Sequence, residues 1–339
     1  MFITPIITDH IEKPRVEEVR DISSFQNQTG TGMKSGSNAA MCKLIADTVV
    51  PNIYLPMGKY VGELHEKWNF PSDHLPIGMT ADGMGVLSWN VLNNCYLEKW
   101  MYELDSQKLN GSLITQLDNV IDEVTGLTER DVYIVDLLLE SLEGKDFVCL
   151  QECGAPFLLH LKEHLSNEWD IIFSSSPEVV DQNVILYRKL EYSFCKNISH
   201  CDEHIFPDFP SNSLMRVVFQ KSDGKLIQIF NTHLPGDPLA NARSEFAEFV
   251  TKHTKTTDIT IATGDMNFNE WQMDKAFQTY TTGYTRLSPY PTNVSPWSFD
   301  PPLMSKAIDH FFVFGCDDIE MIDPEQLIKG TVETLSLLN

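Results

Sequence analysis

The chain has 339 residues, of which 42% are hydrophobic, and it carries a formal net charge of −23 at pH 7. That length is enough for one large domain or two ordinary ones. The negative charge argues against non-specific binding to duplex DNA, although it leaves room for a locally basic cleft. The sequence has no apolar run near 18 residues and no basic start followed by a long apolar segment, so we expect neither a transmembrane helix nor an ordinary secretory signal. Seven cysteines without metal-binding spacing predict reduced thiols and a cytoplasmic protein, with non-classical secretion left open.

The first 70 residues differ in character from the rest of the chain. They are polar and irregular, and they predict an N-terminal arm and partly irregular segment that packs on or near a larger domain at 71–339. The segment GTGMKS at 30–35 lacks the Gly-Lys-Ser/Thr ending of a P-loop, and no clear strand precedes it, so we do not expect a nucleotide site there.

The stretch 72–94 predicts a β-hairpin. Two apolar runs flank Asp82-Gly83, a pair typical of a two-residue hairpin turn. Such a turn places opposite each other residues whose numbers add up to about 165. Asp73, His74 and Asn90 would then gather at one end of the hairpin, which suggests a functional site at that end.

The remaining elements alternate between helices and strands. Leu113 to Val124 follow helical spacing, and Thr128 with Asp131 predicts the capped start of a second helix that Gly144 ends. Further helices are expected at 156–165 and 238–250. Strands are expected at 147–152, 169–173, 183–189, 214–220, 226–234, 258–267 and 307–315. This order predicts an α+β fold, a sandwich of two sheets with helices on the outer faces.

Several predicted strands end in a polar or acidic residue. Each such residue has a structural explanation by itself, as a helix cap, a turn residue or a buried hydrogen-bonded histidine. Their coincidence at strand ends favours a common site. The residues are Asn90, Glu152, His233, Asp265, Asn267 and Asp309.

These residues stand in six motifs: LSWN, LQE, NTHL, GDMN, AIDH and SDHLPI, which together span 72–310. The combination resembles the endonuclease/exonuclease/phosphatase superfamily, whose fold is similar to that of deoxyribonuclease I. The resemblance implies a four-layer α/β/β/α sandwich and a catalytic domain at 71–339.

The order of the motifs departs from the family pattern. In the family the SDH motif comes last, whereas here SDHLPI precedes LSWN. We interpret this as a circular permutation in which the usual last strand precedes the first and the Asp82-Gly83 turn joins them. The alternative is that SDHLPI is an accidental match.

The resemblance also implies roles for individual residues. Glu152 and Asp73, supported by Asn90, would hold Mg²⁺, with Mn²⁺ as a substitute. Asp265 would activate the attacking water and Asn267 would align water or phosphate. The remaining implied roles are phosphate contact by His74, whose ring Asp309 would hold, and phosphate contact or proton donation by His233. Substrate binding would fall to Asn90, Asn267, His233 and Arg243.

The resemblance therefore implies a Mg²⁺-dependent hydrolase of phosphoester bonds. Local similarity of LSWNVLNNCY and THLPGDPLANARSEF to the deadenylase-like branch favours a nuclease or phosphodiesterase on single-stranded nucleic acid or a nucleotide. A phosphomonoesterase on an inositol phosphate or nucleotide is the alternative, and a non-catalytic scaffold is the third. In each enzymatic case the partner is a phosphate-containing substrate. If that substrate has bases, they would stack on Trp271, Tyr290 or Trp297, unless these side chains serve packing alone.

Overall fold

The structure is a computed structural model that describes residues 71–96, 122–173, 182–203, 214–235, 241–287, 293–294, 305–329 and 331. The chain divides into two compact units, Met1–Glu63 and Leu64–Asn339. All described residues belong to the second unit. The predictions for residues 1–70 lie outside the described residues, as does the helix predicted within 113–124 as far as residue 121. Residues 122–124 are described and are not helical, and Val124 is 82% exposed.

The first sheet has six strands in the order β15-β1-β2-β3-β5-β4. Its members are β1 (Ile77–Ala81), β2 (Met84–Asn90), β3 (Phe147–Cys153), β4 (Trp169–Phe173), β5 (Gln182–Arg188) and β15 (Ile319–Met321). β2 and β3 are parallel, and the other neighbours are antiparallel. The parallel pair places the ends of the LSWN and LQE segments at the same edge of the sheet.

The second sheet has seven strands in the order β11-β14-β10-β9-β8-β6, with β7 also paired to β8. They are β6 (Tyr192–Phe194), β7 (His200–Glu203), β8 (Leu214–Lys221), β9 (Leu226–His233), β10 (Ile259–Asp265), β11 (Thr285–Leu287) and β14 (Asp309–Phe314). A further short pair joins β12 (Asn293–Val294) and β13 (Ser305–Lys306). β9 and β10 are parallel, so their C-terminal ends lie side by side.

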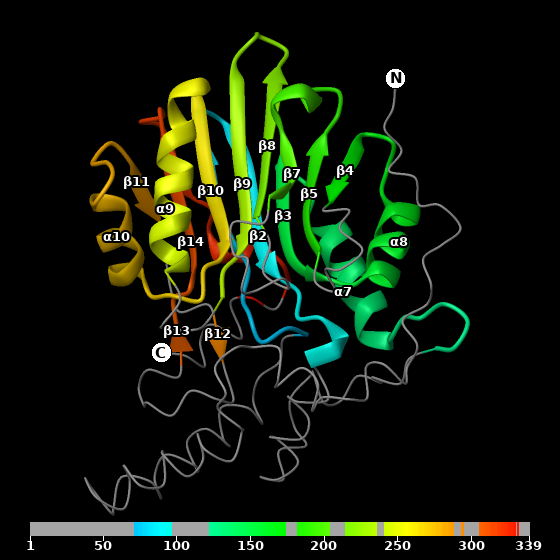
Figure 1. The fold of residues 1–339 in the computed structure, drawn as a ribbon. Coiled ribbons are helices and arrows are strands. Elements are labelled where there is room, and N and C mark those ends of the chain that lie inside the picture. The colour runs from blue at the N-terminus through cyan, green and yellow to red at the C-terminus, as the bar shows by residue number, and fades with distance from the viewer. Residues whose placement is uncertain are drawn as a thin grey trace, which may run out of the picture. The chain divides into compact units, whose positions relative to one another are not determined.

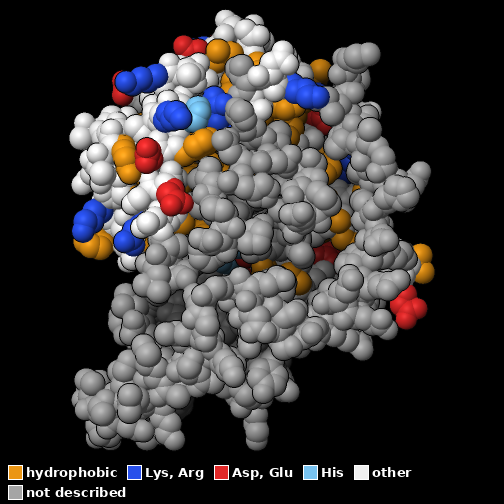
Figure 2. All heavy atoms as spheres, viewed as in Figure 1, with side chains coloured by type: hydrophobic (Ala, Val, Ile, Leu, Met, Phe, Trp, Pro, Cys, Tyr) orange, Lys and Arg blue, Asp and Glu red, His pale blue; other side chains and the backbone are white. Residues whose placement is uncertain are grey.

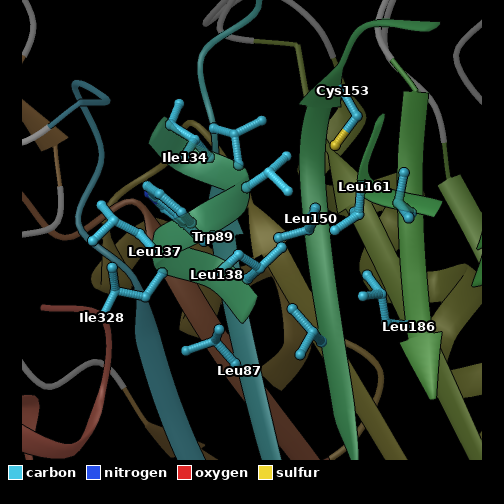
Figure 3. Close-up of a cluster of buried hydrophobic side chains, with 14 of the residues drawn as sticks. Leu87, Trp89, Ile134, Leu137, Leu138, Leu150, Cys153, Leu161, Leu186 and Ile328 are labelled. Carbon is cyan, nitrogen blue, oxygen red and sulfur yellow. The ribbon is translucent and has the colours of Figure 1, made fainter. Parts of the chain in front are cut away.

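Three clusters of buried apolar side chains show that the two sheets form a sandwich with helices outside. Alternate residues of both sheets, such as Val86, Phe147, Ile229 and Ile261, form the layer between the sheets. Helices α7 (Glu129–Glu140) and α8 (Ala155–His164) cover the first sheet through the cluster drawn in Figure 3.

The other outer face belongs to helices α9 (Ala242–His253) and α10 (Glu270–Gln278), which pack on the second sheet through Phe246, Phe277 and Phe312. Figure 1 shows the two helix pairs on opposite flanks of the sheets. The predicted α+β fold with α/β/β/α layers, which the superfamily resemblance implies, is confirmed.

The hairpin of β1 and β2 has the predicted turn and register. Asp82 and Gly83 both have positive φ, 51° and 74°, as a type I′ turn requires. Ile77 lies opposite Ser88, and every pair in the ladder has residue numbers that add up to 165. Trp89 Nε1 donates to the His74 carbonyl at 3.0 Å, so a side chain of β2 also contacts the segment before β1.

The predicted helix start at Thr128 is also confirmed, because Thr128 and Asp131 form a reciprocal capping box. The helical spacing of Val132, Val135 and Leu138 predicts that all three lie on the buried face. Val135 and Leu138 are buried, but Val132 is 37% exposed. Helix α10 and strands β6, β7, β11, β12, β13 and β15 were not predicted. Most of those strands are only two or three residues long, too short to show a periodic pattern.

The described surface is not uniformly acidic despite the net charge of −23. Figure 2 shows lysine and arginine side chains interspersed with acidic ones on the described part of the face it presents. Among the described residues, no helix is both long and apolar enough to cross a bilayer.

Candidate active site

The core of the candidate active site is a row of three side chains at adjacent strand ends of the second sheet. Asp265, the last residue of β10, lies opposite His233 on the parallel strand β9 and opposite Asp309 on the antiparallel strand β14. All three residues are buried. The register alone therefore brings together residues that are up to 76 positions apart in the chain.

The first sheet contributes a second row that faces the first. Asn90, the last residue of β2, pairs with Gln151 on β3, and Glu152 follows. The Asn90 side-chain nitrogen donates to Glu152 Oε1 at 2.8 Å and to Asp265 Oδ2 at 3.0 Å. Asn90 thus bridges the two sheets at the site.

Asn90 presents its amide nitrogen, and not its oxygen, to these carboxylates. Its amide oxygen accepts from the backbone N–H of Leu92 at 3.0 Å. The prediction that Asn90 supports a bound metal ion therefore takes a specific form in this arrangement. Asn90 orients Glu152 and Asp265 through its amide nitrogen.

His74 lies between three carboxylates. Its Nδ1 is 3.0 Å from Asp309 Oδ2, and its Nε2 is 3.5 Å from Asp265 Oδ2 and 4.0 Å from Asp73 Oδ1. Burial lowers the pKa of His74, but the carboxylates of Asp309, Asp265 and Asp73 outweigh that effect and hold the pKa well above its usual value. The site thus favours an imidazolium at this position.

Asp265 is at the centre of the arrangement. Burial raises the pKa of its carboxyl group, while the neighbouring imidazoles of His74 and His233 oppose that rise. Its Oδ1 accepts from the backbone N–H of Asn267 at 2.9 Å. A buried carboxylate with a raised pKa is suited to accept a proton near neutral pH.

His233 and Asn267 complete the rim around Asp265. His233 Nε2 lies 3.6 Å from Asp265 Oδ2 and 3.7 Å from Glu152 Oε1. The Asn267 side-chain nitrogen donates to the Leu234 carbonyl at 2.8 Å, which fixes the amide beside the end of β9. The structure therefore brings His233 and Asn267 to the same site as Asp265.

The backbone is strained where it delivers these side chains. Three non-glycine residues at the site have positive φ: Leu92 at 59°, Glu152 at 60° and Asn267 at 53°. The pairing of β3 with β5 is irregular between Leu150 and Cys153, so Glu152 sits in a bulge. Such conformations cost about 1–3 kcal/mol each and are concentrated at functional sites.

Arg243 stands in the first turn of α9, outside these two rows. Its guanidinium carbon lies 5.4 Å from the centre of the Phe268 ring, and Phe268 follows Asn267 directly in the chain. Stacking on an aromatic ring holds an arginine in place without neutralising it. Arg243 is thus a fixed cation whose stacking partner adjoins Asn267.

The donor set fits a divalent cation. Four buried carboxylates converge at the site, those of Asp73, Glu152, Asp265 and Asp309, together with two histidines. Ligand atoms of Glu152, His233 and Asp265 lie within 4.8 Å of one another. Buried carboxylates in this number need compensating positive charge, and hard oxygen donors favour Mg²⁺ over softer metals.

Several residues that shape the site escaped the sequence analysis. Asn93 donates its backbone N–H to Glu152 Oε2 at 3.0 Å. Ser72 donates its hydroxyl to the Asn90 carbonyl at 2.7 Å and accepts the His74 N–H at 3.1 Å. Two of these positions had a sequence signal: Ser72 begins the SDHLPI motif, and a charge at Arg130 shares the helical face of Ile134 and Leu138.

Comparisons with known proteins give structural likenesses only. No family model matches the sequence, and no curated protein matches it. A humanised D. rerio TDP2 carrying 14 mutations has a TM-score of 0.47 and 16% identity, covering 73% of this chain and 86% of its own. A Bacteroides thetaiotaomicron mannosyl-6-phosphatase has a TM-score of 0.44 and 21% identity, covering 68% and 85%.

The human Nocturnin catalytic domain with bound sulfate is a third similar structure, with a TM-score of 0.42 and 14% identity over 70% of this chain and 86% of that chain. All three TM-scores lie below 0.5. The activities of these proteins are therefore not transferred to this chain, and its own site geometry has to indicate the chemistry.

Proposed function

We propose that this chain is a Mg²⁺-dependent hydrolase of phosphoester bonds. The observation that carries the proposal is the surroundings of Asp265. One buried carboxylate lies within 4 Å of two imidazoles and accepts hydrogen bonds from the side chain of Asn90 and the backbone of Asn267. Phosphoester hydrolysis needs a positioned base, charge relief on the phosphoryl oxygens and help for the leaving oxygen, and this arrangement contains groups suited to all three tasks.

The proposed reaction assigns one task to each group. The water oxygen forms a bond to phosphorus as the bond from phosphorus to the leaving oxygen breaks. Asp265 accepts the water proton, and His233 donates a proton to the leaving oxygen. His74, oriented by Asp309, stabilises the negative charge of a phosphoryl oxygen through its imidazolium. Asn267 aligns the phosphate or the water.

Glu152 and Asp73 would hold Mg²⁺ through carboxylate oxygens, with Asn90 and the Asn93 backbone orienting Glu152. The bound ion would supply electrostatic stabilisation of the phosphoryl oxygens. Mn²⁺ has the same preference for oxygen donors and is expected to substitute.

For the substrate, we propose single-stranded nucleic acid or a nucleotide, cleaved at a diester bond. The support is Arg243, whose guanidinium stacks on Phe268, the residue after Asn267. We propose that this cation pairs with a phosphate beyond the reacting one. A substrate panel tests this proposal: single-stranded RNA, abasic duplex DNA, inositol phosphates and nucleotides, each with Mg²⁺ and with chelator. Hydrolysis of the inositol phosphates alone would instead support a phosphomonoesterase.

Arg243→Ala is expected to raise KM for a substrate with two or more phosphates roughly tenfold or more, because an ionic hydrogen bond is lost. The effect on kcat should be smaller, since Arg243 does not touch the reacting groups. Steady-state kinetics measure both constants. Lys252→Ala, in the last turn of the same helix, is the matched control, and an equal rise in KM there would contradict the assignment to Arg243.

We also propose that the motif order reflects a circular permutation. The support is the hairpin itself, in which the segment with SDHLPI runs through a two-residue turn into the LSWN strand. In addition, His74 reaches Asp309 at 3.0 Å although the two residues are 235 positions apart.

If Asp82-Gly83 is only a join between former termini, inserting three Gly-Ser pairs between them is expected to leave Mg²⁺ affinity within twofold. Thermal unfolding should shift by only a few degrees, because longer surface loops cost little closure entropy. Titration calorimetry and thermal denaturation measure these quantities. Loss of the fold on insertion would argue that the turn is an integral folding element and not a seam.

A further inference from the structure

The buried guanidinium of Arg130 joins the two segments that carry half of the candidate site. Arg130 lies in the first turn of α7 and is 1% exposed. Its Nη1 donates to the carbonyls of Pro71 and Val91, each at 2.9 Å. Its Nη2 donates to the Leu92 carbonyl and to Asn94 Oδ1.

These four acceptors come from two separate parts of the chain. Pro71 begins the segment that carries Asp73 and His74, and this segment contains no helix and no regular strand before β1. Val91, Leu92 and Asn94 form the turn after β2, directly behind Asn90. The Arg130 side chain therefore links the segment before β1 to the segment after β2.

The turn after β2 is the strained part of this arrangement. Leu92 has a φ of 59°, a conformation that costs a branched residue about 1–3 kcal/mol. In that conformation Leu92 N–H points at the Asn90 side chain and Asn93 N–H points at Glu152 Oε2. The bonds from Arg130 to the Val91 and Leu92 carbonyls hold the turn in this state.

Burying a charged guanidinium costs free energy. Its use as a donor to carbonyls is therefore explained only if its geometry is needed. The guanidinium remains charged in proteins and presents several donors in a fixed plane, which a lysine cannot reproduce. The carboxylates of Asp131, Asp73 and Glu152 lie close enough to offset part of the cost of burying this charge. The charge of Arg130 thus sits behind the carboxylates of the proposed metal site.

We infer that Arg130 is a positioning residue for the proposed metal site. Through the Pro71 and Val91–Asn94 segments it holds the proposed ligands Glu152 and Asp73 in place, together with Asn90, which orients Glu152. This inference rests on the proposed function. Its consequence is that loss of Arg130 weakens metal binding although Arg130 touches neither metal nor substrate. A residue needed only for packing would lower stability and leave metal affinity unchanged.

The test compares Arg130→Lys and Arg130→Met with wild type and with Arg216→Met. Arg216 is a matched control because it is also buried and bonds a neighbouring side chain, Gln228 Oε1 at 2.7 Å, but within the second sheet. The measurements are Mg²⁺ and Mn²⁺ affinity by titration calorimetry, amide hydrogen exchange, thermal unfolding, and kcat and KM.

Arg130→Met is expected to weaken metal affinity roughly 10- to 100-fold, as loss of supporting contacts behind ligands does elsewhere. Exchange protection of the Leu92 and Asn93 amides should fall, and kcat should drop more than KM changes. Arg130→Lys should restore part of each loss. Arg216→Met should lower the unfolding temperature with metal affinity within twofold of wild type.

Wild-type metal affinity and kcat in a folded Arg130→Met variant would overturn the inference, even if its stability fell. Failure of both Arg130 variants to fold would also overturn it, because the residue would then be structural. If the wild type hydrolyses nothing in the substrate panel, the proposed function fails. The positioning role is then judged separately on metal affinity and amide exchange.

Discussion

Asp265→Asn is expected to lower phosphoester hydrolysis roughly 10²- to 10⁴-fold, the range that a general base contributes. The amide cannot accept the water proton, yet it has the shape of the carboxylate it replaces. We expect the variant to remain folded, because burial already raises the pKa of Asp265 and an uncharged side chain removes that desolvation cost. Initial rates on the best substrate of the panel, with circular dichroism for the fold, check both statements.

Asp223→Asn is the matched control for this variant. Asp223 is an exposed turn residue between β8 and β9 whose carboxylate accepts from the Lys225 N–H at 3.0 Å. Its replacement should leave the rate within twofold of wild type. An Asp265→Asn variant that kept more than a tenth of the wild-type rate would remove Asp265 from the role of base.

Glu152→Gln is expected to weaken Mg²⁺ binding by at least tenfold and to make turnover depend on much higher Mg²⁺ concentrations. The substitution removes one of the two carboxylates proposed as ligands and keeps the side-chain volume. In the wild type the Asn90 side chain donates to Glu152 Oε1 and the Asn93 backbone N–H donates to Glu152 Oε2. A glutamine can accept only one of these two bonds, because one of its terminal atoms is a donor. Titration calorimetry gives the affinity, and the Mg²⁺ dependence of kcat gives the functional consequence.

Glu320→Gln, at an exposed position on β15, serves as the control and should retain wild-type metal affinity. Excess Mg²⁺ should restore part of the activity of Glu152→Gln, whereas it should not restore Asp265→Asn. Equal rescue of the two variants would show that the proposed division between ligand and base is wrong.

Local sequence patterns predicted a large part of the fold because they depend on neighbours in the chain. The Asp82-Gly83 turn set the register of β1 and β2 to a sum of 165, since a two-residue hairpin allows one pairing. The capping box at Thr128 and the apolar runs of β3, β4, β8 and β9 were recognisable for the same reason. The short strands at sheet edges were not, because two or three residues carry no period.

The sequence predicted which residues form the candidate site, but it did not predict how their side chains contact one another. Polar residues after apolar runs identified Asn90, Glu152, His233, Asp265 and Asp309. Register pairing of β9, β10 and β14 then placed three of them side by side. The side-chain contacts across the sheets, such as Asn90 to Asp265, depend on how the two sheets face each other, and a single sequence does not encode that distance locally.

The sequence by itself determined most of the longer elements, the hairpin and the residue types of a hydrolytic site, because propensity, turn chemistry and alternation act over a few residues. The tertiary structure alone decided three things. It turned the Asn90 amide nitrogen toward Glu152, it placed His74 between three carboxylates, and it buried Arg130 against the carbonyls of Pro71 and Leu92. Apart from Asp73, which adjoins His74, the groups in these contacts are 38 to 235 positions apart. They meet in a low-dielectric interior, where charge and hydrogen bonding are set by the final packing.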